Sequence, residues 1–189
     1  MINHKHHEAM ILAKSGGYEK LLSFKKATII YDGTVYFCRR YLNSRDRTVD
    51  QMVQAARSGK QNIVEGSLAS ATSKETEIKL TNVARASLGE LLVDYQDYTR
   101  VHRIEIWGYD HKLRKRLAEI NRDADANYDS FRRAIENESV EIVVNTMIFL
   151  VDKAMFLLQQ QLKWLEQDFV EHGGIRERMT QQRRLHRGY

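Results

Sequence analysis

The sequence has 189 residues, enough for one domain with a substantial core, and its formal net charge is +5. Hydrophobic residues make up 42% and charged residues 29%, a balance that suits a soluble folded protein. Cys38 is the only cysteine, which excludes an intramolecular disulfide and a thiolate metal cluster and indicates a reducing compartment.

Proline is absent, although the average usage of ~5% would place several in a chain of this length. Long uninterrupted helices tolerate this absence, whereas loop-rich β folds rarely show it. Apolar runs such as residues 147–151 are far too short to cross a bilayer. We therefore predict an all-α protein with no membrane association and a cytoplasmic location.

The first segment, residues 1–17, is expected to be a loosely ordered leader that ends at a Gly-Gly break. Its apolar stretch, residues 9–13, is too short for a signal peptide. Its histidines could bind a metal as a short His-rich tract, but a leader without fixed structure explains them better. These histidines are His4, His6 and His7.

A first helix is predicted over residues 18–42, because apolar side chains recur on one face. A polar turn at residues 43–46 separates it from a second helix, which is predicted from residue 48 to residue 66 or 70. Thr48 or Ser44 is expected to cap the second helix.

The second helix carries a narrow apolar seam with alternating spacings of three and four. Small residues fill its second half, so another backbone can approach there more closely than a leucine seam would allow. The two interior glycines cost about 1 kcal/mol each relative to alanine, which predicts that close packing offsets the loss. The seam consists of Val49, Met52, Ala56, Gly59, Ile63 and Gly66.

The third helix is predicted to begin at Thr72, which fits a capping box with Glu75, and to continue to about residue 103. A turn at residues 107–110 and a short basic helix at residues 111–120 follow.

The final helix is predicted over residues 128–171, with a break near residues 137–139 or an overhang. Without a break it would be about 65 Å long, more than a compact bundle needs. The four main helices predict an up-down-up-down antiparallel four-helix bundle over residues 18–171, with a short extra helix before the last long one. Residues 172–189 form an Arg-rich tail.

Basic residues surround the first and third connections, which this topology places at one end of the bundle. Phosphate contacts from such a surface would be largely independent of sequence and sensitive to salt. The alternative is a solvated helix end whose cations pair with Asp46, Asp50, Glu105 and Asp110. The candidate nucleic-acid-binding residues are Arg39, Arg40, Arg45, Arg47, Arg100, Arg103, Lys112, Arg114, Lys115 and Arg116.

Two segments carry a resemblance to a known family. Residues 57–66, RSGKQNIVEG, resemble the S-I-x-x-N-I-A-E-G signature of the four-helix-bundle proteins encoded within 23S ribosomal RNA intervening sequences. That family includes accessory variability proteins of diversity-generating retroelements. Residues 83–91, VARASLGEL, are similar to its A-x-x-S-x-x-E-L stretch on the third helix. The motif residues matched here are Asn62, Glu65, Gly66, Ser87 and Glu90.

The resemblance implies a four-helix bundle that assembles into a ring, commonly a pentamer, and in some members binds nucleic acid or a reverse transcriptase. No enzymatic activity is established for the family. Gly59 and Lys60 stand where the family often has isoleucine and proline, and both residues 107–126 and the tail lie outside the family pattern.

The polar motif residues have two interpretations. They could contact a ligand or another subunit, or they could form a polar network that joins the second and third helices and fixes their register. We favour the network, since polar groups inside helix bundles commonly set register. Glu65 lies beside the seam, where a carboxylate would need partners.

No catalytic constellation is present: the sequence has no Glu-x-x-His pair, Gly-rich phosphate loop or nucleophile elbow. We therefore expect no enzyme activity, metal or other cofactor. The function predicted is a homo-oligomeric bundle that binds RNA or DNA, with RNA favoured, and the alternative is a scaffold for a protein partner. Leu150, Leu157 and Trp164 lie off the seam of the last helix and are expected at a subunit interface.

Overall fold

The computed structural model describes residues 17–174, 177, 179–180, 183–184 and 187. All of the predicted leader except Gly17 lies outside the described residues, as does much of the Arg-rich tail. The described ranges contain helices and no strand, which confirms the all-α prediction. The elements are η1 (Tyr18–Lys20), α1 (Leu22–Tyr41), α2 (Arg47–Ala69), α3 (Lys74–His102), α4 (Lys112–Asn121), α5 (Tyr128–Ile135) and α6 (Val140–His172).

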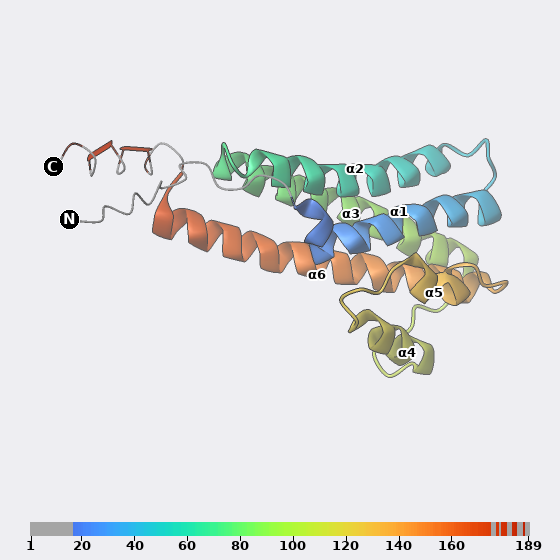
Figure 1. Ribbon diagram of the computed structural model, residues 1–189. Helices are drawn as coiled ribbons and strands as arrows, with labels where there is room; N and C mark the ends of the chain where they lie inside the picture. Colours follow the sequence, from blue (N-terminus) through green and yellow to red (C-terminus); the bar gives the residue numbers. More distant parts are fainter. Residues whose placement is uncertain (1–16, 175–176, 178, 181–182, 185–186, 188–189) are drawn as a thin grey trace.

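The four long helices, α1, α2, α3 and α6, lie side by side along the long axis of the molecule (Figure 1). Helices α1 and α3 each contact both α2 and α6, so the four helices enclose a common core. The short helices α4 and α5 pack against α6. The protein is therefore a helical bundle with two short helices attached to one side.

An aromatic cluster occupies the core near the α1–α2 turn. The ring of Phe37 makes edge contacts with the rings of Tyr95 and Tyr98, with centroids 5.0 and 4.9 Å apart. The hydroxyl of Tyr95 donates to Thr34 Oγ1 over 3.0 Å, so this buried phenol is satisfied. Cys38 is 2% exposed, and burial raises the pKa of its thiol to about 12, which leaves it an unreactive core residue.

The small residues of α2 allow a close approach to α3, as the seam predicted. Gly59 faces Leu88 so closely that a Cβ atom would lie 2.7 Å from Leu88 Cδ2. At Gly66 an added Cβ would lie 3.4 Å from the backbone oxygen of Glu77. At both glycines, which have poor helix propensity, α2 therefore lies close to α3: Gly59 packs against a core side chain and Gly66 against the backbone.

Helix α2 begins one residue earlier than predicted, and its N-cap is Asp46 rather than Thr48 or Ser44. The Asp46 backbone is extended, and its carboxylate accepts the Thr48 N–H over 2.9 Å. Hydrogen bonds from the backbone and the side chain of Thr48 lower the pKa of Asp46. The capping prediction was wrong because Asp46 was assigned to the turn.

Helix α3 is capped by Ser73, whose Oγ accepts the Thr76 N–H over 3.1 Å, so the predicted capping box of Thr72 and Glu75 is also wrong. Thr72 instead closes the end of α2, since its N–H donates to the carbonyl oxygen of Ala69 over 2.9 Å. Ser73 needs no acidic partner at the third helical position to serve as a cap.

The predicted break in the last helix is confirmed, because α5 ends at Ile135 and α6 begins at Val140. The Tyr41 hydroxyl donates to the carbonyl oxygen of Asn137 over 2.8 Å and ties the break to α1. Helix α1 starts later than predicted because a short 3-10 turn and the extended Leu21 precede it.

The Gly59→Ala variant is expected to destabilise the protein by about 1–3 kcal/mol, because the added methyl group overlaps the fully buried Leu88. The matched control is Gly89→Ala on α3, where the nearest atom, Met155 Cε, lies 3.6 Å from the added Cβ. That variant is expected to gain about 0.5–1 kcal/mol from helix propensity. Urea unfolding measures both, and equal effects of the same sign would contradict close packing at Gly59.

Candidate nucleic-acid interface

The predicted basic residues come from three segments of the chain. Arg39 and Arg40 lie in the last turn of α1, Arg45 lies in the turn, and Arg47 is the first residue of α2. All four are exposed. Their position follows from the short α1–α2 connection, which leaves the end of one helix beside the start of the next.

The second set lies at the end of α3 and on α4. Arg100 lies in the last turn of α3, and Arg103 is its C-cap, with a left-handed backbone (φ 56°). Both are exposed, as are Lys112, Lys115 and Arg116 on α4.

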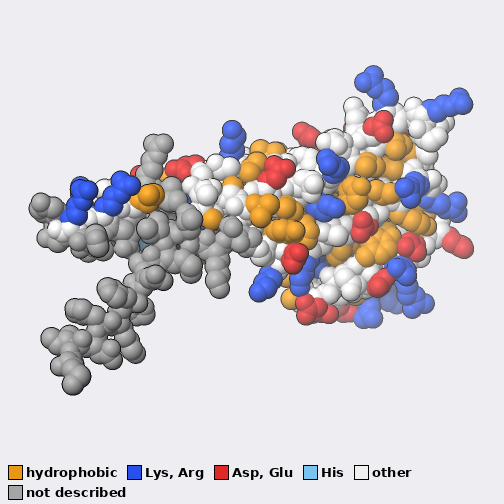
Figure 2. Space-filling model, turned by 45° about the horizontal axis from the view of Figure 1, so that its top comes forward, with side chains coloured by type: hydrophobic (Ala, Val, Ile, Leu, Met, Phe, Trp, Pro, Cys, Tyr) orange, Lys and Arg blue, Asp and Glu red, His pale blue; other side chains and the backbone are white. Residues whose placement is uncertain are grey.

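Figure 1 places the α1–α2 turn and the end of α3 at the same end of the bundle, and α4 projects sideways from the same half. The two sets of cations therefore share one half of the molecule. Figure 2 shows Lys and Arg side chains gathered at this end, with Asp and Glu side chains between them.

Several of these cations have acidic neighbours on the surface. Arg100 lies 2.9 Å from Asp97, Lys115 lies 3.2 Å from Asp110, and Arg116 lies 3.0 Å from Glu119. Exposed pairs of this kind contribute little and exchange readily with other anions. Of the four acidic partners expected from the sequence, only Asp110 forms an ion pair with these cations among the described residues, while Asp46 caps α2.

Arg114 differs from the other basic residues because its side chain is only 13% exposed. Its guanidinium lies 3.8 Å from Asp152 on α6 and donates to the carbonyl oxygen of Trp107 over 3.4 Å. It also stacks on Tyr109, 4.8 Å from the ring centroid. Burial raises the pKa of Asp152, while Arg114 and Lys153 oppose that shift. The structure therefore places Arg114 inside the attachment of α4 to α6.

Asn145 on α6 completes this attachment, and its role was not predicted from the sequence. Its Oδ1 accepts the Trp107 N–H over 2.8 Å, and its Nδ2 donates to the carbonyl oxygen of Glu105 over 3.0 Å. The indole N–H of Trp107 donates to Glu141 over 3.0 Å. The available signal was the one amide side chain in residues 143–151, a run that is apolar apart from Asn145 and Thr146.

The family-motif residues separate into two groups. Ser87 and Ser58 share a hydrogen bond of 2.9 Å between α3 and α2, and Asn62 donates to the carbonyl oxygen of Ser58 over 2.9 Å. Glu65 and Glu90 are exposed. The polar contact between the helices is therefore made by hydroxyl groups, and the expectation that Glu65 needs buried partners is wrong.

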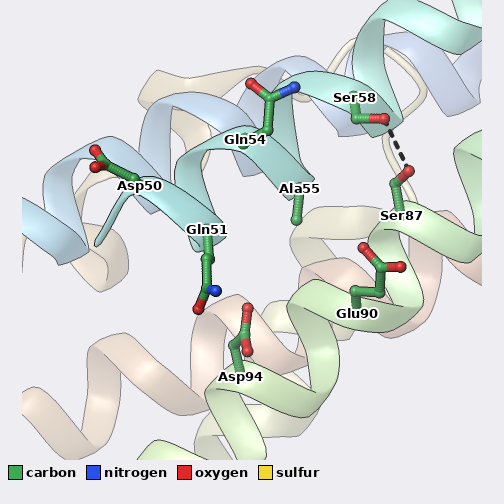
Figure 3. A pocket seen from close by; sticks show the side chains of 8 residues that line it. All are labelled: Asp50, Gln51, Gln54, Ala55, Ser58, Ser87, Glu90 and Asp94. Carbon is green, nitrogen blue, oxygen red and sulfur yellow. Dashed lines mark hydrogen bonds between the residues drawn. The ribbon is translucent and has the colours of Figure 1, made fainter. Parts of the chain in front are cut away.

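A groove of about 660 Å³ runs between α2 and α3 and carries carboxylates (Figure 3). Burial and the neighbouring charges of Asp97 and Glu90 raise the pKa of Asp94 in this groove. The negative charge of these carboxylates repels phosphate, so the groove is not part of the candidate interface. It is lined by Asp50, Gln51, Gln54, Ala55, Ser58, Ser87, Glu90 and Asp94.

No group of three or more His, Cys, Asp or Glu side chains that could hold a metal ion occurs within the part of the chain that the structure describes. Over the same residues, no helix combines the length and the apolar character needed to cross a membrane. Comparison of the chain with protein-family models, with curated proteins and with solved structures finds no match in any of the three.

The Arg114→Gln variant is expected to lose about 1–2 kcal/mol of stability, because it removes the ion pair with Asp152 and the contact with the Tyr109 ring. Lys115→Gln on the same helix is the matched control and is expected to change stability by less than about 0.5 kcal/mol. Urea unfolding of both variants checks this, and equal stabilities would place Arg114 among the free surface cations.

The Asp94→Asn variant is expected to be slightly more stable than the native protein at pH 7. The folded pKa of Asp94 is raised, so the cost of its ionised form is fully present above that pKa and disappears as the pH falls toward 3.8. The gain is a fraction of a kilocalorie per mole because solvent screens this side chain. Thermal unfolding between pH 7 and pH 3.5 measures it, and a gain that persists at the acid end would contradict the assigned cause.

Proposed function

We propose that the protein is a non-enzymatic, homo-oligomeric helical bundle that binds nucleic acid, with RNA the favoured ligand. The binding surface is the basic end, defined as the exposed cations at the α1–α2 turn, the end of α3 and α4. The observation that carries this proposal is that cations from three separate segments share one half of the molecule. The basic end consists of Arg39, Arg40, Arg45, Arg47, Arg100, Arg103, Lys112, Lys115 and Arg116.

The chemistry of the basic end fits a phosphate backbone. Its ion pairs are exposed and weak, so phosphates can replace the carboxylates with little loss. Arginine forms two parallel hydrogen bonds to a phosphate group, and several such cations on one surface favour a polyanion over a single small anion. Binding of this kind is independent of sequence and falls steeply with salt.

The resemblance to the 23S rRNA intervening-sequence proteins supports the same proposal. Its two motif segments lie on α2 and α3, and the Ser58–Ser87 hydrogen bond joins them. The helix order and the two short turns fit the up-down-up-down four-helix bundle of that family. From the family we also take the ring-like oligomer, commonly a pentamer, and the binding of nucleic acid.

The proposed subunit interface needs one correction. Leu150 is fully buried in the core of the chain and cannot contribute. Leu157 is half-buried, whereas Trp164 is 61% exposed and Phe156 on the same helix is 59% exposed. Two large exposed apolar side chains on α6 therefore support an oligomer interface along that helix.

A protein-interaction scaffold is the second candidate, and the exposed apolar side chains of α6 favour it. The basic end would then steer an acidic protein partner rather than bind nucleic acid. Pull-down from nuclease-treated lysate separates the two functions, since a protein partner survives the nuclease and a nucleic-acid link does not.

Single-stranded RNA of mixed sequence is expected to bind the native protein with an affinity that falls linearly on a log–log plot against salt. Replacing Arg39, Arg40, Arg45 and Arg47 with Gln should weaken binding and reduce the slope by about one for each phosphate that the variant can no longer neutralise. Fluorescence anisotropy over a salt series measures both quantities.

The matched control replaces Lys20, Arg57, Lys79 and Lys163 with Gln, because these exposed cations lie outside the basic end. This variant also loses four positive charges but is expected to keep most of the affinity and the slope. Equal losses in both variants would show that net charge alone attracts RNA and would remove the basic end as a site.

A further inference from the structure

A groove of about 490 Å³ lies between α4, α5 and α6. We call it the α4–α6 groove, and its apolar lining includes Leu113, Ile120 and Ile142. Leu113 is 39% exposed, and the two isoleucines are half-buried, so these side chains present an apolar surface that remains open to solvent. A groove that joins an apolar surface to a few polar groups is the usual form of a binding site.

Trp107 forms part of the groove wall, and its position is fixed from several sides. Asn145 accepts its backbone N–H, and Glu141 accepts its indole N–H over 3.0 Å. The indole ring also stacks on His111, with the ring centroids 4.3 Å apart. These contacts hold the wall in place before any ligand is present, so the groove is preformed.

One arginine from each of the two short helices borders the groove. Arg116 on α4 belongs to the basic end. Arg133 on α5 is exposed and forms no ion pair within the part of the chain that the structure describes, whereas the neighbouring Arg132 pairs with Asp129 and Glu136. Helix α5 lies in the same half of the molecule as the α1–α2 turn (Figure 1). The groove therefore continues the basic end and adds one cation to it.

This combination matches the repeating unit of a polynucleotide. A nucleotide chain presents a flat base with apolar faces between two phosphates, and the groove presents an apolar surface beside two arginines. The volume of 490 Å³ equals roughly sixteen water molecules at about 30 Å³ each, which leaves room for one base and its ribose. A duplex keeps its bases paired and stacked, so only a single strand can fill the groove at little cost.

The polar side chains of the lining already have partners within the chain. Thr146 Oγ1 donates to the carbonyl oxygen of Ile142 over 2.7 Å, and Asn137 Nδ2 donates to that of Arg133 over 3.3 Å. The Ser130 hydroxyl belongs to the capping box at the start of α5. These groups therefore read the edge of a base poorly, which fits binding that is independent of sequence.

We propose that the α4–α6 groove takes up one unpaired base of the RNA bound at the basic end, an assignment that rests on the proposed function. The base lies against Leu113, Ile120 and Ile142, and the phosphates beside it pair with Arg116 and Arg133. The ligand of the basic end is then single-stranded RNA of any sequence, and base burial adds to the electrostatic attraction.

The test uses fluorescence anisotropy at low salt, with the full-length protein and two six-nucleotide strands of equal charge. One strand carries ribose phosphates without any base, and the other carries a single central adenine. The adenine strand is expected to bind at least about fivefold more tightly, because only this strand can fill the groove. Equal affinities would overturn the proposal.

Ala134→Phe on α5 fills the groove without changing the charge. It should reduce the affinity for the adenine strand to that for the abasic strand. The matched control is Ala118→Phe on α4, which adds the same ring at a separate pocket between α1, α4 and α6 and should keep the preference for adenine. Loss of the preference in both variants would overturn the proposal. If Ala134→Phe does not fold, the comparison of the two strands on the native protein decides the question.

Arg133→Gln should weaken the binding of both strands and reduce the salt slope by about one. Its matched control is Arg132→Gln on the same helix, which should change both quantities less because Arg132 does not border the groove. Equal effects in these two variants would overturn the proposal, since a strand that fills the groove must contact Arg133.

Failure of the proposed function would give a different result. Neither strand would then bind, or replacing the four arginines of the α1–α2 turn would leave the affinity for both strands unchanged. If only the groove is wrong, both strands bind equally and both still depend on those arginines.

Discussion

Asn145 holds the segment after α3 against the bundle, and the position of α4 depends on that contact. This side chain is 3% exposed within the apolar run of α6, where it accepts from the Trp107 N–H and donates to the carbonyl oxygen of Glu105. The Trp107 amide would otherwise be buried without a partner, at a cost of about 1–3 kcal/mol. The bundle and the attached helix are therefore joined by a polar contact inside an apolar surface.

This attachment distinguishes cations that are used within the fold from those of the basic end. Arg114 and Lys25 are used within the fold, where each joins α4 or the connection after it to a long helix. The cations of the basic end are exposed and held only by weak local pairs. Sequence alone cannot separate the two kinds, because burial depends on which face of α4 meets α6.

The helices themselves were largely predictable. The apolar seam of α2 and the close approach at Gly59 follow from periodicity and residue size, and the break after α5 follows from the excessive length of an unbroken last helix. The N-caps at Asp46 and Ser73 were missed because adjacent polar residues offered competing caps, and backbone geometry decided between them. Asn145 was missed because its role arises from segments far apart in the sequence.

The most direct measurement is amide hydrogen exchange on Asn145→Ala, with Thr146→Val as control, since the Thr146 hydroxyl bonds within its own helix. We expect residues 104–121 to exchange much faster in Asn145→Ala while α1, α2 and α3 keep their protection, and RNA affinity to fall with the loss of α4. The control should leave both unchanged. Unaltered protection of residues 104–121 in Asn145→Ala would contradict the dependence of α4 on this contact.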